Sequence, residues 1–256
     1  MMGAVREVLG AASAGQGAMT AMRRLLLVDL VLIAAHCVTL VIDVLADAPG
    51  LADAFDLTRR FSVPTLYIYG KWAVAAAVLL AAWRRGGRWL GPVAAVFLAL
   101  LVDDAGELHE TGGGMIADAF GLPAIFGLRA KDLGELAMMA GLGVFCFGAL
   151  GIAWRMAPRD QRPLVAVLAV LLVLLSVFGA VVDMLHIAVV GPVEGRVLRF
   201  ALDQTFVLIE DGGEMVVATM LLAAALAAAA RASRREPGAS PPTARPRRLH
   251  NGRRPG

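Results

Sequence analysis

Charged residues are scarce in this sequence. Asp, Glu, Lys and Arg make up only 18% of the 256 residues, whereas about a quarter is usual in a soluble domain. Hydrophobic residues make up 59%, and the mean hydropathy is +0.72. The apolar residues come in runs of roughly 20, the length that crosses about 30 Å of hydrocarbon. The composition therefore predicts an integral membrane protein and leaves no segment for a separate soluble domain.

Cysteine is also scarce, and common catalytic motifs are missing. Cys37 and Cys146 both lie within apolar runs and form no CxxC pair, so neither a redox motif nor a disulfide framework is expected. The sequence contains no phosphate-binding loop, no GxSxG nucleophile elbow and no HExxH motif. Motifs therefore do not decide whether this protein is an enzyme.

Six apolar runs predict an all-α, polytopic membrane helix bundle. Arginine clusters and acidic loops alternate between the runs, so the positive-inside rule predicts that both termini are cytoplasmic, in a plasma or inner membrane. Ala46 opens an A-x-A sequence, but the first run is too long for a signal peptide and is interpreted as a retained helix. We expect a cytoplasmic segment at 1–22, a six-helix transmembrane domain at 23–230 and a basic tail at 231–256. The expected runs are Leu25–Ala46, Phe61–Trp83, Trp89–Glu110, Leu133–Trp154, Pro163–Val190 and Leu198–Ala230.

The C-terminal tail is rich in arginine and proline. Such a segment cannot form a core, so it is expected to be disordered. In a membrane protein this composition favours attraction to anionic lipid headgroups over nucleic-acid binding, which is not expected. The expected partners are therefore the lipid bilayer and its anionic headgroups, with a homo-oligomer left open.

Two further segments carry packing signals. Ala137, Gly141 and Gly148 place small residues on one face of the fourth run, which favours close contact with a neighbouring helix. The loop 111–132 opens with three glycines after Thr111. Two interpretations of this loop stay open: an amphipathic or re-entrant segment over the outer face, or an ordinary interfacial loop.

Acidic residues reach a similar depth in five of the six runs. Asp43 comes roughly 27 Å along the first helix, and Asp183 lies roughly 30 Å into the fifth. Ionisable residues within apolar helices are energetically costly and typical of functional sites. Spacings of three, four and seven place several of these acids on shared helix faces, which should point into the bundle. The candidate site residues are Asp43, Asp103, Asp104, Glu107, His109, Glu135, Asp183, His186, Glu210, Asp211 and Glu214.

Charge compensation leads to the cofactor hypothesis. Carboxylates held close together as anions repel, so protons, a buried base or a metal ion must compensate them. Lys71, the one lysine within an apolar run, is expected to compensate one charge. The remaining carboxylates favour a divalent metal ion. Oxygen ligands alone would suit Mg, Ca or Mn, and the addition of His109 or His186 would favour Mn, Fe or Zn.

The acidic segments also resemble one another. Val102–Leu108 matches Ile209–Met215 with identical or similar residues at every position, and Asp132–Leu136 repeats the D-x-G-E core. The third and sixth helices run in opposite directions under the expected topology, which is typical of transporters built from inverted repeats. A partial inverted repeat is therefore one hypothesis, and convergence of short motifs is the alternative.

Other polar residues have simpler interpretations. Asp29, little more than a turn past Arg24, is expected to form an ion pair at the membrane interface. His36 is interpreted either as part of a polar stripe with Asp43 or as a hydrogen-bonded core histidine. Solvated acids at helix ends are expected at Asp47, Glu110, Asp132 and Asp203.

Three functions are compatible with these features. The leading hypothesis is a cation-binding membrane protein that transports or senses a divalent metal or protons. The second is a membrane-embedded metal-dependent enzyme, a hydrolase or oxidase, acting on a lipid-like substrate, with metal-bound water as nucleophile and a carboxylate as base. The third is a non-catalytic membrane subunit whose polar cluster fixes helix packing.

Overall fold

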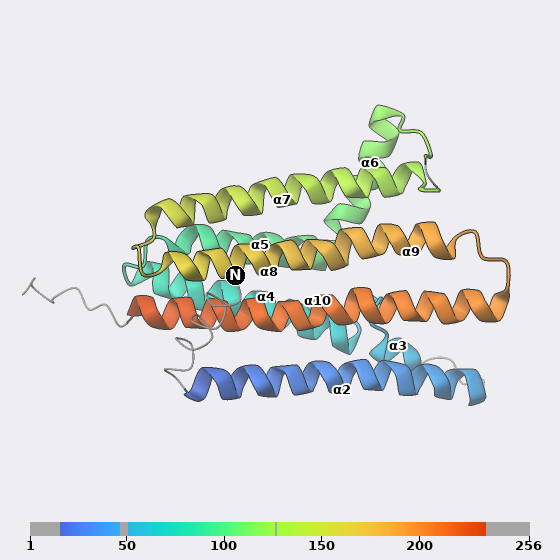
Figure 1. Cartoon of the computed structure of the whole chain (residues 1–256), viewed down its shortest axis with the longest axis horizontal. Helices are drawn as coiled ribbons and strands as arrows, with labels where there is room; N and C mark the ends of the chain where they lie inside the picture. Colours follow the sequence, from blue (N-terminus) through green and yellow to red (C-terminus); the bar gives the residue numbers. More distant parts are fainter. Residues whose placement is uncertain (1–15, 47–50, 126, 234–256) are drawn as a thin grey trace, which may run out of the picture.

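The computed structural model describes residues 16–46, 51–125 and 127–233. Apart from a short antiparallel bridge between Ile125 and Leu128, the secondary structure of these residues is helical (Figure 1). The helices are α2 (Gln16–Ala46), α3 (Leu51–Phe55), α4 (Val63–Arg84), α5 (Leu90–Gly106), α6 (Leu108–Phe120), α7 (Ala130–Met156), α8 (Arg162–Ser176), the π-helix η1 (Val177–Val182), α9 (Asp183–Val190) and α10 (Arg196–Ser233).

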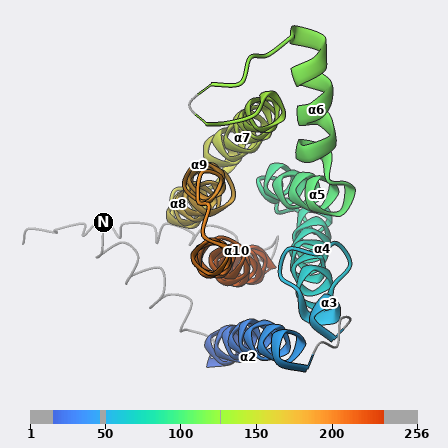
Figure 2. The ribbon, with the colours of Figure 1, turned by 90° about the vertical axis from the view of Figure 1, so that its right-hand side faces the viewer.

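Helix α10 lies at the centre of the bundle. It packs against α2, α4, α8 and η1, and Figure 2 shows these elements around it in end view. The α2 N-terminus and the C-termini of α7 and α10 lie at one end of the bundle (Figure 1, left). We call this the arginine-rich end, because Arg155 and Arg231 lie in the last turns of α7 and α10.

The half of the bundle near the arginine-rich end holds the main apolar core. Buried alanines of α10 pack there against leucines and valines of α5 and α8. Trp72 and Phe97 belong to the same core, and their ring centroids lie 6.0 Å apart. Small alanine side chains let α10 approach its neighbours closely. This half of the molecule is therefore a tightly packed, nonpolar layer.

Five helical segments are long and apolar enough to cross a membrane, which is compatible with a multi-pass membrane protein. They span Met19–Leu45, Val63–Arg84, Ala130–Met156, Arg162–Val190 and Arg196–Ser233.

The third expected run, Trp89–Glu110, is divided in the structure. Helix α5 ends at Gly106 after 17 residues, because Glu107 adopts a left-handed conformation (φ 50°) before α6 begins. A non-glycine residue rarely adopts positive φ. The predicted count of six uniform helices is therefore not confirmed.

The break at Glu107 also bears on the predicted repeat. Its partner in the repeat, Glu214, lies within the continuous helix α10. The two similar segments thus have different backbone conformations at matched positions. The partial inverted repeat is not confirmed.

The loop expected at 111–132 contains a helix. Helix α6 packs on the first turns of α7, and the two backbones come closest at Gly113 and Gly134. A Cβ at Gly134 would overlap the carbonyl oxygen of Gly113, and one at Gly113 would lie 2.5 Å from the Glu135 backbone nitrogen. Close packing thus requires glycine at both positions. Gly134 is the glycine of the D-x-G-E segment, so its presence in that segment has a structural explanation.

The small-residue face of α7 does not make the contact predicted for it within the chain. Ala137, Gly141 and Gly148 are exposed, and no described atom lies within 4 Å of a Cβ built at either glycine. The reason is that α7 turns its other faces toward α5, α6 and α8.

Three predictions fall largely outside the described residues: the segment before Gln16, the A-x-A sequence after Ala46, and the tail beyond Ser233. Where the chain is described, α2 already begins at Gln16 and α10 continues to Ser233.

We expect Gly134→Ala to lower the stability of the purified protein by about 1–3 kcal/mol, because the new methyl group meets backbone atoms that cannot rotate away. Gly141→Ala is the matched control on the same helix, where the position is open and alanine should be neutral or stabilising by up to about 1 kcal/mol. Thermal unfolding in detergent measures both. Equal behaviour of the two variants would show that the α6–α7 crossing is not tight.

Candidate functional site

A cavity of about 990 Å³ lies in the half of the bundle away from the arginine-rich end. Its walls come from the first half of α4, the end of α5, the first half of α7, the end of α8, η1, α9 and the first half of α10, with α6 at one side. In the end view of Figure 2, α4, α5, α7, α8, α9 and α10 form a ring, and α6 lies outside it. The cavity and the apolar core thus occupy opposite halves of the same helices.

The cavity brings together ten of the eleven candidate site residues. They come from five different elements, which the sequence could only place at similar depth. They are Asp103, Asp104, Glu107, His109, Glu135, Asp183, His186, Glu210, Asp211 and Glu214.

Asp43 is the candidate that the structure does not bring to the cavity. It lies near the end of α2, and no residue of α2 lines the cavity. Its Oδ1 atom is buried without a hydrogen-bond partner among the described residues. The expectation that Asp43 converges with Glu107, Asp183 and Glu214 is therefore not met.

Acids outnumber bases in the cavity lining. Ten carboxylates face four arginines or lysines and two histidines. Charge compensation within the protein is therefore incomplete even if both histidines are protonated. This imbalance is the main electrostatic property of the site.

Asp103 and His109 form a pair at the α5–α6 break. His109 Nδ1 lies 2.9 Å from Asp103 Oδ2. Burial by itself lowers the pKa of His109, but the hydrogen bond to Asp103 and the charges of Asp103, Glu110 and Asp104 outweigh it and raise the pKa. The imidazolium is therefore stabilised where the chain leaves α5.

His186 bridges two carboxylates of α10. Its Nε2 lies 3.0 Å from Asp203 Oδ1 and its Nδ1 lies 3.3 Å from Glu210 Oε2. The ring also stacks on Phe206, with centroids 5.2 Å apart. These contacts hold α9 to α10 and fix the orientation of the imidazole.

Three of the four basic residues at the cavity are already paired. Arg60 lies 3.2 Å from Glu107 and donates to the carbonyl of Ala105, near the C-terminal end of α5. Lys131 pairs with Glu135 at 3.0 Å. Arg129 is the third.

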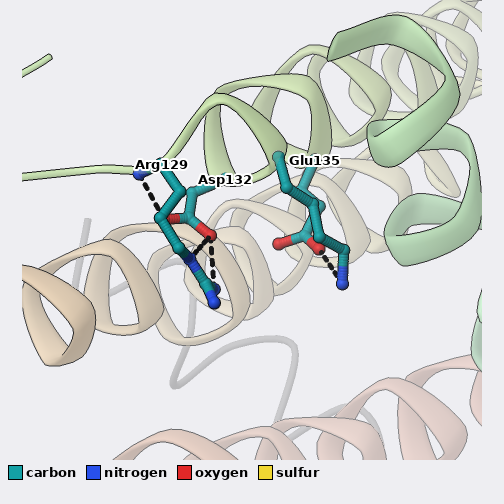
Figure 3. Close-up of polar contacts among 4 residues, drawn as sticks. Arg129, Asp132 and Glu135 are labelled. Carbon is teal, nitrogen blue, oxygen red and sulfur yellow. Dashed lines mark hydrogen bonds and ion pairs between the residues drawn. The ribbon is translucent and has the colours of Figure 1, made fainter. Parts of the chain in front are cut away.

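Arg129 caps α7 together with Asp132. Figure 3 shows its guanidinium turned back on Asp132, at 2.7 Å, with Glu135 further along the helix. The backbone nitrogen of Arg129 also donates to Asp132 Oδ2 at 2.7 Å. These hydrogen bonds and the carboxylate charge raise the pKa of Arg129 further. Asp132 is fully buried, so its interpretation as a solvated acid was wrong.

The α4 wall contributes neutral donors. Trp72 Nε1 donates to Asp104 Oδ2 at 2.7 Å, and the Tyr69 hydroxyl donates to the Asp104 carbonyl at 3.1 Å. Asp104 is thus held at the inner boundary of the cavity by groups that carry no charge.

Asp183, Asp211 and Glu214 have no such partner. Among the described residues, none of the three forms a hydrogen bond or an ion pair, although all line the cavity. Glu214 lies closest to the apolar core, with its Oε1 directly against Gly179 of η1. Glu110 also has no such partner among the described residues, but it is exposed, so Asp183, Asp211 and Glu214 are the partly buried carboxylates whose charge the protein itself does not compensate.

Lys71 lies outside the cavity and pairs with Asp29. Its Nζ is 2.6 Å from Asp29 Oδ1 and donates to the Met215 carbonyl at 2.8 Å, while Thr219 donates to Asp29 Oδ2 at 2.7 Å. Asp29 is fully buried, so the expected interfacial pair with Arg24 was wrong. Lys71 compensates this carboxylate and none of those in the cavity.

His36 is buried on the same helix as Asp29, yet neither ring nitrogen has a hydrogen-bond partner among the described residues. His36 is therefore a buried histidine, but the expected hydrogen bond is not found among the described residues.

A bound metal ion requires several donor side chains that converge on one point. Within the described ranges, no three His, Cys, Asp or Glu side chains converge as ligands of one ion. The acids are spread along the cavity walls, and several are held by Trp72, Arg60 or Lys131. The arrangement shown therefore does not fit a preformed metal centre.

Sequence reasoning missed several cavity residues. Asp203 and Glu110 were assigned to solvated helix ends, yet both line the cavity and Asp203 contacts His186. The spacing of seven between Asp203 and Glu210 was the available signal. Nothing local in the sequence marks Trp72, Tyr69 or Arg60 as cavity residues.

The fold and the cavity together describe an all-helical bundle, compatible with an integral membrane protein, that has an acid-lined cavity in one half. Residues 24–230 match the family model described as a domain of unknown function, DUF8692. The chain belongs to this family. No curated protein and no solved structure matches the chain.

We expect Asp29→Asn to destabilise the protein by about 3–5 kcal/mol, because it leaves the Lys71 ammonium buried without its counter-charge. The double variant Asp29→Leu, Lys71→Met removes both charges and should recover most of this loss. Unfolding temperatures of the three proteins in detergent test the pair. A double variant as unstable as Asp29→Asn would show that the pair does more than balance charge.

His109 gives a pH-dependent prediction. Its pKa is raised in the folded protein, so its contribution to stability is complete below the unfolded value near 6.5 and is lost as pH rises through the folded value. The difference in unfolding temperature between wild type and His109→Gln should therefore be largest at acidic pH and shrink at alkaline pH. A difference that grows with pH would contradict the assigned pairing with Asp103.

Proposed function

We propose that this protein is an integral membrane protein that crosses the bilayer six times, with α5 as the sixth crossing and both termini cytoplasmic. A 17-residue helix is about 25 Å long, which is slightly short of the hydrocarbon core, and α6 after it runs across the bundle instead of along it (Figure 2). The arginines at one end of the bundle support the cytoplasmic orientation through the positive-inside rule. The cavity then lies in the outer half of the membrane.

We propose further that the cavity binds cations. The observation that carries this proposal is the excess of carboxylates over basic residues in the lining of one cavity. Carboxylates repel strongly at low dielectric, and the imbalance is reduced only by bound protons or metal cations. Asp183, Asp211 and Glu214, which lack partners, are the groups on which such cations would act.

Protons fit the observed side chains better than a metal ion. A proton needs one carboxyl group, whereas Mg²⁺ or Ca²⁺ needs six or more oxygens at about 2.0–2.6 Å. The carboxylates here do not converge in that manner. A divalent ion would require several side chains to leave their present partners, so we rank it second.

Access to the cavity is one-sided. On the side of the arginine-rich end, the cavity is followed by the apolar core, and Asp29 in that half is already paired with Lys71. No chain of free polar groups is therefore available there among the described residues of the core. This favours a protein that senses or exchanges cations with the outer side, and transport would require a second conformation.

An enzymatic function has its own supporting observation. His186 is oriented by Asp203 and Glu210 beside a cavity whose size is typical of small-molecule sites. A histidine oriented by carboxylates is a suitable general acid or base. Apolar wall residues such as Leu100 and Met139 would accommodate a lipid-like substrate.

Labelling with dicyclohexylcarbodiimide tests cation binding. This apolar reagent reacts with protonated carboxyl groups in membrane sites, and mass spectrometry identifies the modified residue. We expect labelling of Glu214 or Asp211 at neutral pH, slower labelling at higher pH, and none at position 214 in Glu214→Gln.

Added cations then distinguish the candidates. If Mn²⁺ or Ca²⁺ protects Glu214 from the reagent, the cavity binds a metal ion, and if only alkaline pH protects it, protons are the bound cation. Asp118, exposed on α6 outside the cavity, is the internal control and should not react. An absence of labelling throughout the cavity, together with no cation-dependent protection, would refute the proposal.

A further inference from the structure

The π-helical turn η1 meets α10 through two reciprocal contacts. Glu214 Oε1 lies against Gly179, where a Cβ would overlap it. One residue away on each helix, the Phe178 ring lies over Gly213, where a Cβ would be 2.5 Å from Cδ1 and Cε1. A side chain of each helix therefore sits on a glycine of the other.

This contact occurs where the helix geometry changes. The span Arg162–Val190 is α-helical except at Val177–Val182, which forms the π-helix. Such turns are rare, insert one residue into the helix, and are found frequently at functional sites. The insertion rotates everything that follows by about one residue, roughly 100°.

That rotation determines which residues of α9 line the cavity. Asp183 begins α9 directly after the π turn, and His186 follows one turn later with its contacts to Asp203 and Glu210. Without the inserted residue, both side chains would leave their present positions. The π turn therefore orients the α9 wall while it makes room for Glu214.

We infer that Gly179 is a positioning residue for Glu214, and that the π turn couples the Glu214 carboxylate to the orientation of Asp183 and His186. This inference rests on the proposed function in one respect, namely that Glu214 is a group on which the bound cation acts. The positioning of Glu214 by Gly179 is inferred only from the contacts of Gly179 and Gly213, and it does not depend on cation binding.

The nearest atoms around Gly179 make the position testable. After Glu214, whose Oε1 and Cδ are closest to a Cβ there, the next nearest atom of another residue is Met139 Cε, at 3.9 Å. An alanine at 179 thus collides with the end of one flexible side chain and with no backbone. The expected response is displacement of the Glu214 carboxylate into the cavity.

The first experiment compares Gly179→Ala with Gly148→Ala by carbodiimide labelling of the full-length protein in detergent. Gly148 is exposed on α7, is not part of the cavity lining and has open space around it. Glu214 should label several-fold faster in Gly179→Ala, with weaker protection by alkaline pH or added Mn²⁺, and Gly148→Ala should behave as wild type. Measurable but equal labelling of Glu214 in all three proteins would overturn the inference.

The second experiment is a stability cycle that does not depend on cation binding. Gly179→Ala should lower the unfolding temperature by about 2–4 °C, as expected for about 1 kcal/mol in a chain of this size. In a Glu214→Ala background the same substitution should have no such effect, because its collision partner is gone. If Gly179→Ala fails to fold, its recovery in the Glu214→Ala background decides the same question.

The two experiments separate the two claims. If Gly179→Ala lowers the unfolding temperature equally with and without the Glu214 side chain, the positioning role is overturned, whatever the labelling shows. If Gly179→Ala is destabilising only when the Glu214 side chain is present, but the wild-type cavity shows no labelling and no protection, Gly179 is a positioning residue and the cation site is refuted. Altered nuclear magnetic resonance signals of His186 in Gly179→Ala would support the coupling, and unchanged signals would overturn it.

Discussion

Burial of charge away from water is the constraint on which this structure depends. An ionised side chain in a nonpolar medium is unfavourable by several kcal/mol unless another charge or hydrogen bonds compensate it. In the half near the arginine-rich end, the buried ion pair is compensated, because Lys71 and Thr219 both donate to Asp29, and the main core there is apolar. In the other half it is not, and there the helices leave a cavity instead of a packed core.

The difference between the two halves follows from side-chain size and charge along the same helices. Helix α10 carries alanines toward its C-terminus and acids in its first half, and its neighbours change in the same way. Alanine allows close packing, whereas carboxylates keep helices apart or require room for water and ions. The bundle is therefore closed at one end and hollow at the other, which supports one-sided binding.

Backbone irregularities occur where the acids are densest. The left-handed Glu107 ends α5 and turns the chain into α6, the Gly113–Gly134 crossing fixes α6 on α7, and η1 rotates α9. Each departure from regular helix places polar residues on the cavity wall. Regular helices of the same sequence would turn some of these residues away from the cavity and toward the outer surface of the bundle, which is largely apolar.

The sequence by itself determined the all-helical class, the approximate bounds of five helices that are long and apolar enough to cross a membrane, and the common level of the acids along the bundle. These follow from local properties, namely hydrophobic run length and the rise per residue. It also indicated ten residues that share the cavity, because spacings of three, four and seven define a helix face.

Only the tertiary structure decided which partner each acid has. Asp29 and Asp43 lie on one stripe of α2, yet one is fully compensated by Lys71 from α4 and the other lies outside the cavity. The break at Glu107 and the π turn at Gly179 were likewise not readable, and each contacts a residue distant in sequence, Arg60 at Glu107 and Glu214 at Gly179. Depth is a property of one helix, whereas charge compensation belongs to pairs of helices and depends on how they rotate and pack.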